Sequence, residues 1–380
     1  MSLYPAVLDL STLDGTDGFQ ILGASRNSLA GTSVASFGDI NGDGYADIVI
    51  GAFNALNDDG KRTGAAYVVY GHSGGSEPLV RLTHLDGDNG YAILATSHGL
   101  DGVNSYTGQS TVSLGDINGD GFADFMISAP FEDHDGIGKA GADYVVFGGP
   151  GGAPSLSVDD LNGTNGFAIT ADIRHEQFGA WIGAGGDING DGYADILVAD
   201  PNYNGAAGRI YVIFGHAGDY SAALNPLSLD GSNGFTIDGP PQQPPVSSFG
   251  IVETCVGDLT GDGIDDIVVS GFASAYFIPG SASGFAAVET PSSMGGYFVS
   301  SRDDSVLFAG GDINGDGYRD LIVGDPQLGQ GETRFQGAAY IEFGGPSFTM
   351  TLTASDLDGT NGFSVSGLEQ GDGKIGRAHV

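Results

Sequence analysis

A nine-residue segment rich in acidic side chains occurs five times in this chain. The copies begin at Asp39, Asp116, Asp187, Asp258 and Asp312, and each carries an oxygen-bearing side chain at positions 1, 3, 5 and 9. Hard divalent cations such as Ca²⁺ take about 6–8 oxygen ligands. Alternate side chains can converge on one ion if the backbone curls tightly, and glycine at positions 4 and 6 permits this curl by adopting positive φ. The segment therefore has the composition of a calcium-binding loop.

Each copy offers the same candidate ligands, namely the side chains at positions 1, 3, 5 and 9 and the backbone carbonyl at position 7, where the side chain varies. The candidates are Asp39, Asn41, Asp43, Tyr45, Asp47, Asp116, Asn118, Asp120, Phe122, Asp124, Asp187, Asn189, Asp191, Tyr193, Asp195, Asp258, Thr260, Asp262, Ile264, Asp266, Asp312, Asn314, Asp316, Tyr318 and Asp320. We expect about five Ca²⁺ sites, with the Thr260 copy weakest because a hydroxyl is a poorer ligand. Mg²⁺ is disfavoured, since it retains its waters and seldom uses all-protein cages.

A set of tight turns is the competing interpretation of these segments. Turns favour Asp-Gly and Asn-Gly pairs for their own conformational reasons. A turn alone does not account for an acid at position 9 in all five copies, or for the strict aspartate at position 1. The fivefold recurrence therefore favours cation binding.

The loops belong to a longer repeated unit. A small-residue and apolar stretch precedes each loop, and a fully apolar run such as Ile48-Val49-Ile50 follows it. Runs that are apolar at every position indicate strands covered on both faces. A third strand such as 66–71 comes next, and an Asp-Gly turn then leads to an aromatic-led strand such as Phe167-Ala168-Ile169. Four short antiparallel strands in each unit predict the blades of an all-β propeller, in which neighbouring blades cover both sheet faces.

The repeats predict a single propeller over residues 1–374. Five full blades are expected at about 23–95, 96–171, 172–239, 240–300 and 301–367. Residues 1–22 are expected to form an unpaired outer strand of a closing blade, and the fourth unit is trimmed. Residues 375–380 break the repeat and match one reading frame of a sequencing adapter, so we expect a non-native tail. A β-solenoid is the alternative fold, but its rungs are much shorter than these units.

The composition argues against several classes of protein. A net charge of −36 disfavours nucleic acid, because phosphate binding needs a basic surface. No run approaches the ~18 apolar residues of a membrane span, so no membrane insertion is expected, and no signal peptide is visible. Cys255 is the single cysteine, expected as a small buried residue in a strand. No Gly-x-Ser-x-Gly, His-Glu-x-x-His or Walker motif is found, so no catalytic residues or organic cofactor are predicted.

The repeated units resemble FG-GAP repeats, which form the blades of the integrin α-chain propeller and of many bacterial surface proteins. Phe178-Gly179 and Phe249-Gly250 match the FG half, and Ser128-Ala129-Pro130 approximates the GAP half. The Asp-x-Asn-x-Asp-Gly-x-x-Asp loop between the two halves is the calcium site of that family. The resemblance implies a β-propeller, typically seven-bladed, of which this chain holds a truncated part.

The same resemblance implies a function. We expect an extracellular or cell-surface, secreted bacterial module that is not an enzyme and mediates adhesion or protein interaction as part of a larger multidomain chain. Its expected partner is a protein or a glycan. The alternative is an accessory propeller domain of a secreted hydrolase, either a phospholipase or a polysaccharide-active enzyme. A third and weaker hypothesis is a catalytic propeller with its site in the central channel.

Overall fold

The structure is a computed structural model in which short β-strands joined by turns make up most of the chain. The residues that it describes are 9–57, 59–74, 77–95, 104–134, 136–170, 178–239, 249–250, 252–271, 274–294, 297–299, 306–325, 338–348 and 357–366. The predicted tail at 375–380 lies outside them. Cys255 lies in a strand as predicted, but its side chain is outside the described part.

Five antiparallel sheets follow one another along the chain, each with four strands in sequence order. The first contains β2 (Val34–Phe37), β3 (Asp47–Gly51), β4 (Ala65–Val69) and β6 (Gly90–Leu94). The second contains β7 (Thr111–Gly115), β8 (Asp124–Ala129), β9 (Ala142–Val146) and β11 (Gly166–Thr170). The third contains β12 (Ile182–Gly186), β13 (Asp195–Asp200), β14 (Arg209–Ile213) and β16 (Gly234–Asp238). The fourth contains β17 (Val252–Gly257), β18 (Asp266–Gly271), β19 (Ser274–Ile278) and β21 (Tyr297–Val299), and the fifth contains β22 (Val306–Gly311), β23 (Asp320–Asp325), β24 (Ala338–Glu342) and β25 (Gly362–Ser366).

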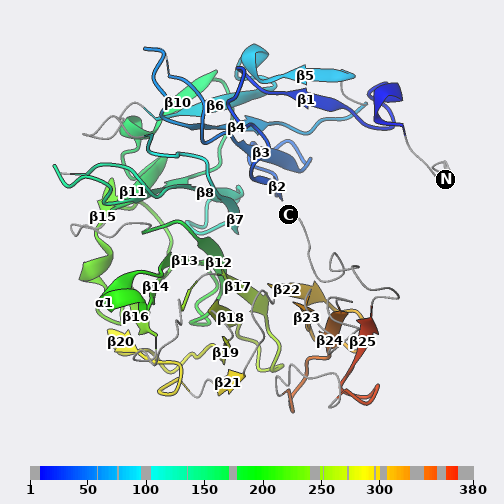
Figure 1. Cartoon of the computed structure of the whole chain (residues 1–380), viewed down its shortest axis with the longest axis vertical. Coiled ribbons are helices and arrows are strands. Elements are labelled where there is room, and N and C mark those ends of the chain that lie inside the picture. The colour runs from blue at the N-terminus through cyan, green and yellow to red at the C-terminus, as the bar shows by residue number, and fades with distance from the viewer. Residues whose placement is uncertain are drawn as a thin grey trace, which may run out of the picture.

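The sheets are arranged around a common centre as the blades of a β-propeller (Figure 1). The first strand of each sheet is innermost, and β2, β7, β12, β17 and β22 contact one another in succession. The sheets form an open arc, with a gap between the first and the fifth (Figure 1). The predicted fold class, an all-β partial propeller, is confirmed.

The outer edges of the first three sheets, and the N-terminal strand at 20–22, each carry a short parallel strand that the sequence did not predict. The strand comes from the connection between the third and fourth strands of the next sheet and lies against the outer edge of the preceding one. These pairs are β6 with β10 (Ser155–Ser157), β11 with β15 (Ala223–Leu224), β16 with β20 (Val288–Glu289), and β1 (Gln20–Leu22) with β5 (Leu79–Arg81). The N-terminal strand expected to be unpaired thus has one parallel partner. Covering the outer edge in this way satisfies backbone groups that would otherwise be open to another chain.

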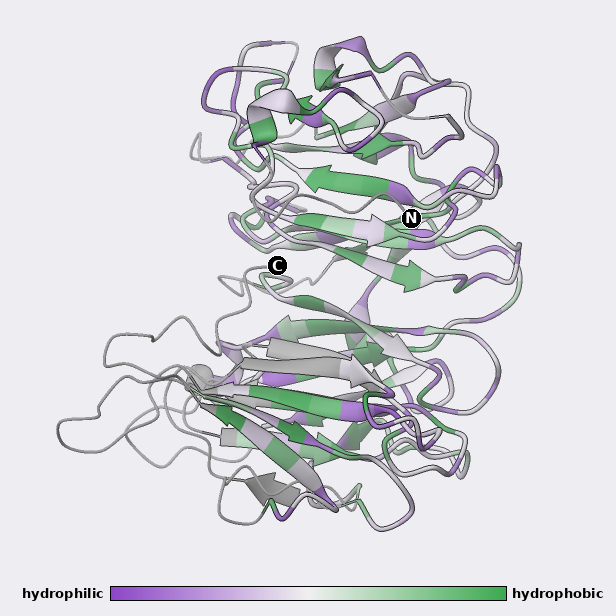
Figure 2. Ribbon diagram, turned by 90° about the vertical axis from the view of Figure 1, so that its right-hand side faces the viewer, coloured by the Kyte–Doolittle hydropathy of each residue, from purple (hydrophilic) through white to green (hydrophobic). Residues whose placement is uncertain are grey.

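The hydrophobic core is divided into layers between consecutive sheets. Every residue of β4, β8 and β9 is buried, as predicted for strands covered on both faces. Phe37 and Val49 of the first sheet pack with Phe125 and Ile127 of the second, and later sheets repeat this arrangement. Figure 2 shows the hydrophobic residues along the strands and the hydrophilic ones mainly in the turns.

In the described residues, helical structure is limited to short turns. These are the 3-10 segments Leu10–Thr12, Leu82–His84, Val158–Asp160 and Pro226–Ser228 and the single α1 turn Tyr203–Ala206. Within the described residues, no helix is long and apolar enough to cross a membrane.

Candidate metal centres

The five acidic loops occupy equivalent places in the five sheets. Each connects the first strand of its sheet to the second, and its position 9 is the first residue of that second strand. The loops therefore all lie at the same end of the blades. The structure brings positions 1, 3, 5, 7 and 9 of each copy together in one compact turn.

The backbone of the loops curls as the sequence predicts. Gly42 and Gly44 have φ of 79° and 90°, and the corresponding glycines of the other four loops lie between 74° and 95°. In three of the five loops, a neighbouring ring also leaves no room for a side chain at position 4. A Cβ built on Gly42 would collide with the ring of Phe122, which is position 7 of the next loop, and Gly119 is covered by Tyr193 in the same way. The variable residue at position 7 thus packs on the preceding loop.

The aspartate at position 1 organises the turn by accepting backbone hydrogen bonds. Asp39 Oδ1 accepts the N–H groups of Gly42 at 2.7 Å and Asp43 at 3.0 Å, and its Oδ2 accepts that of Gly44 at 2.7 Å. Asn41 supports the turn by accepting the Asp43 N–H through Oδ1 and donating to the Asp43 carboxylate through Nδ2. The bonds from positions 5 and 6 to the position-1 aspartate recur in all five loops.

The aspartate at position 9 ties the loop to the third strand. Asp47 is fully buried, and its two oxygens accept the N–H groups of Ile40 and Gly71, both at 2.8 Å. The glycine that follows the third strand is the second partner in all five blades; the other four pairs are Asp124 with Gly148, Asp195 with Gly215, Asp266 with Gly280, and Asp320 with Gly344. Position 9 therefore has a structural role that needs no cation, which sequence reasoning missed. The only signal in the sequence was the glycine at the end of each third-strand run.

The hydrophobic residue at position 2 holds each loop against the core. Ile40, Ile117, Ile188 and Leu259 are at most 1% exposed between consecutive sheets. Ile313 of the fifth loop is 42% exposed, and no described sheet packs on that side. Neighbouring loops are also bonded directly, because the Asp39 carbonyl accepts the Ala123 N–H at 3.1 Å.

Burial and repulsion both act on the position-9 carboxyls. Burial raises the pKa of Asp124 to about 7, that of Asp195 to about 8 and that of Asp266 to about 6, and it also raises the pKa of Asp47. The hydrogen bonds from backbone N–H groups oppose this shift, while the carboxylates at positions 1 and 5 increase it in the first three loops. The carboxylates of one loop are thus close enough to repel one another.

The loops fit a calcium ion in their donor chemistry. Among the described residues, no three His, Cys, Asp or Glu side chains are gathered into a finished metal cage, because the carboxylates point to the N–H groups of their own loop. The donors are nevertheless all oxygens on one turn, and an oxygen that accepts one hydrogen bond retains a second lone pair. Such a set suits a hard cation and offers no thiolate or imidazole to a softer metal.

The fourth loop differs at position 3. Thr260 Oγ1 is buried and has no hydrogen-bond partner among the described residues, whereas Asn41 at the same place makes two side-chain bonds. The Thr260 N–H instead donates to Asp266 Oδ2 at 3.1 Å. This loop therefore lacks the two side-chain bonds that position 3 makes in the first loop.

Comparison with known families agrees with the repeat structure. The FG-GAP repeat family matches residues 30–69, 108–146, 178–213 and 307–341. These segments cover the first three strands and the acidic loop of the first, second, third and fifth sheets. The fourth sheet, which carries Thr260, lies outside the matched segments.

Several animal proteins are similar to the chain. Integrin alpha-5 of Xenopus laevis is 33% identical over 199 residues, which are 50% of this chain and 16% of that protein. Integrin alpha pat-2 of Caenorhabditis elegans is 29% identical over 253 residues, or 65% of this chain and 18% of that protein. Integrin alpha-PS2 of Drosophila melanogaster is 30% identical over 189 residues, or 47% of this chain and 12% of that protein. The similarity thus covers less than a fifth of the length of these relatives.

Proposed function

Because the chain is an FG-GAP repeat protein similar to integrin α chains, we propose that it is a calcium-stabilised, non-catalytic propeller module. Its role is adhesion or protein interaction outside the cell or on its surface. The observation that supports this proposal most is the fivefold repetition of one oxygen-lined turn with the same glycine conformation and the same backbone bonds from positions 5 and 6 to the position-1 aspartate.

The residues at positions 1, 3, 5 and 9 would hold the ion, together with the position-7 carbonyl. When bound, calcium supplies positive charge that offsets the repulsion between the carboxylates of one loop. The residues of the chain supply the rest of the effect. Asp47 already joins its loop to Gly71 at the end of the third strand. An ion that holds the loop would therefore also stabilise the turn that follows the third strand. The bond between the Asp39 carbonyl and Ala123 extends this bracing to the next blade.

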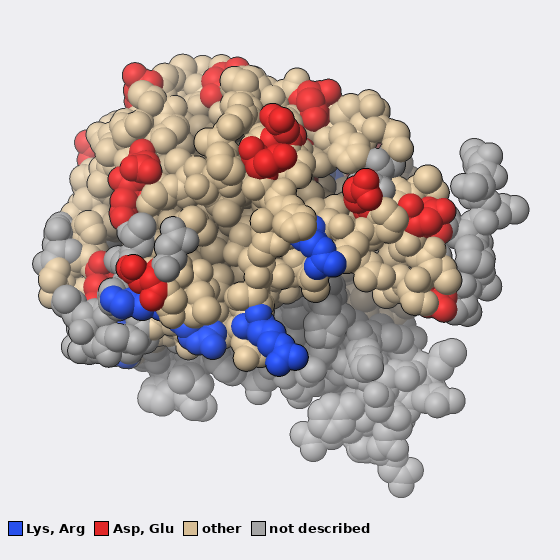
Figure 3. All heavy atoms as spheres, turned by 90° about the horizontal axis from the view of Figure 1, so that it is seen from above, with Lys and Arg blue, Asp and Glu red and all other residues tan. Residues whose placement is uncertain are grey.

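The calcium affinity expected for such loops and the net charge of the chain both fit an extracellular setting. Calcium sites of extracellular modules have Kd values of about 10⁻⁴–10⁻³ M, which are filled outside cells but not in the cytosol. The net charge of −36 exceeds what five divalent ions would offset, and Figure 3 shows acidic side chains spread over the face seen there. Such a surface disfavours anionic partners.

Calcium removal tests the metal assignment. A ligand that binds only the folded state stabilises it by about 1.4 kcal/mol per site at ten times its Kd, so filling several loops raises the melting temperature by many degrees. We expect a chelator to lower the melting temperature, excess calcium to restore it, and equal magnesium to restore much less. Calorimetry with elemental analysis checks this result. An identical melting curve with and without chelator, together with no bound calcium, would refute the assignment.

The interaction role needs a separate measurement. Immobilised chain is expected to retain extracellular proteins or whole cells in calcium and to release them in chelator. Retention that is the same for the calcium-loaded chain and for a heat-denatured sample would count against an interaction surface made by the fold.

A further inference from the structure

Three aromatic rings meet at the outer end of two blade interfaces. In the second sheet, Phe147 and Phe167 lie 5.9 Å apart, and Tyr220 from the next sheet stacks on Phe167 at 4.7 Å with its plane within 5°. In the third sheet, Phe285 from the fourth sheet stacks on Phe235 in the same way, with ring centroids 4.2 Å apart and an angle of 8° between the ring planes. The third and fourth blades thus each place one ring on the aromatic pair of the preceding blade.

The first interface lacks this third ring. Its aromatic pair is Tyr70 and Tyr91, 6.1 Å apart, and the residue in the place of Tyr220 and Phe285 is Gly152. The equivalence follows from a shared contact. The carbonyls of Gly152, Tyr220 and Phe285 each cover the glycine of the preceding Asp-Gly or Asn-Gly turn, at Gly87, Gly163 and Gly231 respectively. No side chain therefore fills the position above Tyr91.

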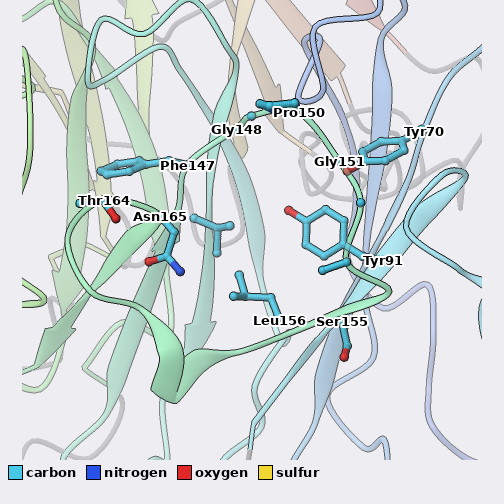
Figure 4. A pocket seen from close by; sticks show the side chains of 14 residues that line it. Tyr70, Tyr91, Phe147, Gly148, Pro150, Gly151, Ser155, Leu156, Thr164 and Asn165 are labelled. Atoms are coloured by element: carbon cyan, nitrogen blue, oxygen red, sulfur yellow. The ribbon is translucent and has the colours of Figure 1, made fainter.

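A cavity of about 310 Å³ remains where the ring is missing. Tyr70 and Tyr91 form one wall, Phe147 lies at the other side, and the glycine-rich loop 148–152 crosses over it (Figure 4). The loop is exposed from Pro150 onwards, so the cavity is open to solvent. In Figure 4 the Tyr91 hydroxyl points into the space below the loop.

The two remaining rings also differ in chemistry from their equivalents. Where the third ring is present, the pair is Phe147 with Phe167 or Phe214 with Phe235; where it is absent, both rings are tyrosines. Burial, together with Asp47 and Asp43, raises the pKa of Tyr70 to about 12, and burial raises that of Tyr91. Both hydroxyls therefore stay protonated at physiological pH and can donate hydrogen bonds. The cavity lined by Tyr70, Tyr91 and Phe147, which we call the slot, therefore combines an aromatic face with polar groups at its edge.

We propose that this slot between the first and second sheets binds one ring of a neutral saccharide. A pyranose presents a face of C–H groups that can stack on the electron-rich face of a tyrosine ring, and its hydroxyls can bond the tyrosine hydroxyls and the backbone of the glycine loop. A purely aromatic occupant would be matched better by the phenylalanine pairs of the other blades. Asp43 and Asp47 act electrostatically on Tyr70, which disfavours an anionic sugar. The slot adjoins the first acidic loop, but none of its lining residues is a candidate calcium ligand, so the proposal does not rest on calcium binding.

Saturation-transfer NMR on the full chain in calcium tests the proposal, with methyl glycosides of neutral hexoses and N-acetylhexosamines as probes and a neutral glycan array for longer chains. We expect at least one saccharide to bind. Tyr91→Phe removes one hydrogen-bond donor without changing the ring, and it should weaken binding about five-fold. Tyr91→Ala should abolish binding.

Tyr106→Phe is the matched control, because it makes the same chemical change in a ring that packs on Phe53 and Phe131 instead. It should bind as wild type does. A folded chain that binds no neutral saccharide would overturn the proposal, as would a Tyr91→Phe variant with unchanged affinity. Tighter binding of p-cresol than of any sugar would assign the slot to an aromatic partner group and would equally overturn it.

Discussion

Asp195 and Asp143 are both fully buried, but among the described residues only Asp195 has hydrogen-bond partners. Asp195 closes the third acidic loop and accepts the N–H groups of Ile188 and Gly215, both at 2.9 Å. Asp143 lies in β9, at the opposite end of the neighbouring sheet, and neither of its oxygens accepts a hydrogen bond from a described residue. Its carboxyl faces Gly179, where any added Cβ would collide with it.

The two ends of the blades are therefore built under different constraints. At the loop end, position 9 is aspartate in every copy, because two backbone N–H groups in each blade depend on it. At the opposite end, the strand position of Asp143 is occupied by Ala66, Ile210 or Ala275 in other blades, as the strand registers show. The loop end is a repeated scaffold, and the opposite end tolerates variation.

The largest expected effect is that of Asp195→Ala in calcium-free buffer. The variant leaves two buried N–H groups unpaired, and each such group costs about 1–3 kcal/mol. We expect the free energy of unfolding to fall by about 2–5 kcal/mol, measured by chemical denaturation with a chelator present. Calcium should widen the difference, because the variant also loses a ligand.

Asn189→Ala is the control for that variant. It removes exposed hydrogen bonds within the same loop, so its cost without calcium should be well below that of Asp195→Ala. Equal costs would show that the buried bonds of position 9 contribute nothing special, and the contrast between the two ends would be lost.

The next effect has the opposite sign. Asp143→Ala removes a buried carboxyl that has no hydrogen-bond partner in the described part of the chain, and it introduces the residue found at Ala66 and Ala275. Burying an unpaired polar group costs about 1–3 kcal/mol, so the variant should be more stable than wild type by about 1–2 kcal/mol at neutral pH. Thermal unfolding in saturating calcium checks this result, and a less stable variant would contradict it.

The gain should also depend on pH. Burial raises the pKa of Asp143 well above its ordinary value, so the folded chain holds a proton that the unfolded chain releases above about pH 4. The contribution of this group to stability is complete below its unfolded pKa and is lost as pH rises towards the folded pKa. The advantage of Asp143→Ala over wild type should therefore grow from pH 4 to pH 7. A constant difference would mean that the carboxyl is not held neutral.

These two aspartates also show what could be predicted from the sequence. The acidic loop and the apolar run after it recur once in every blade, so the strands on either side of the loop could be predicted from the sequence. The parallel strands β10, β15 and β20 were missed, because they are only two or three residues long and depend on contact with the preceding sheet.

The candidate sites were likewise predictable only in part. The glycines at positions 4 and 6 carry a local backbone requirement, so their conformation could be inferred from residue type. The bond from Asp47 to Gly71 joins residues from two different turns, and the missing ring at Gly152 is apparent only against the stacked rings of other blades. Neither feature has a signature within a single segment.

The smallest expected effect concerns the one loop that departs from the scaffold. Thr260→Asn should supply the two side-chain bonds that Asn41 makes in the first loop and a better calcium ligand, with a gain of about 0.5–1.5 kcal/mol. Asn189→Thr is the reciprocal exchange in the third loop and should lose a similar amount. Calcium titration by calorimetry of both variants and wild type measures the change at one site against four unaltered ones. If the two exchanges shift affinity in the same direction, position 3 does not set the calcium affinity of the fourth loop relative to the other four.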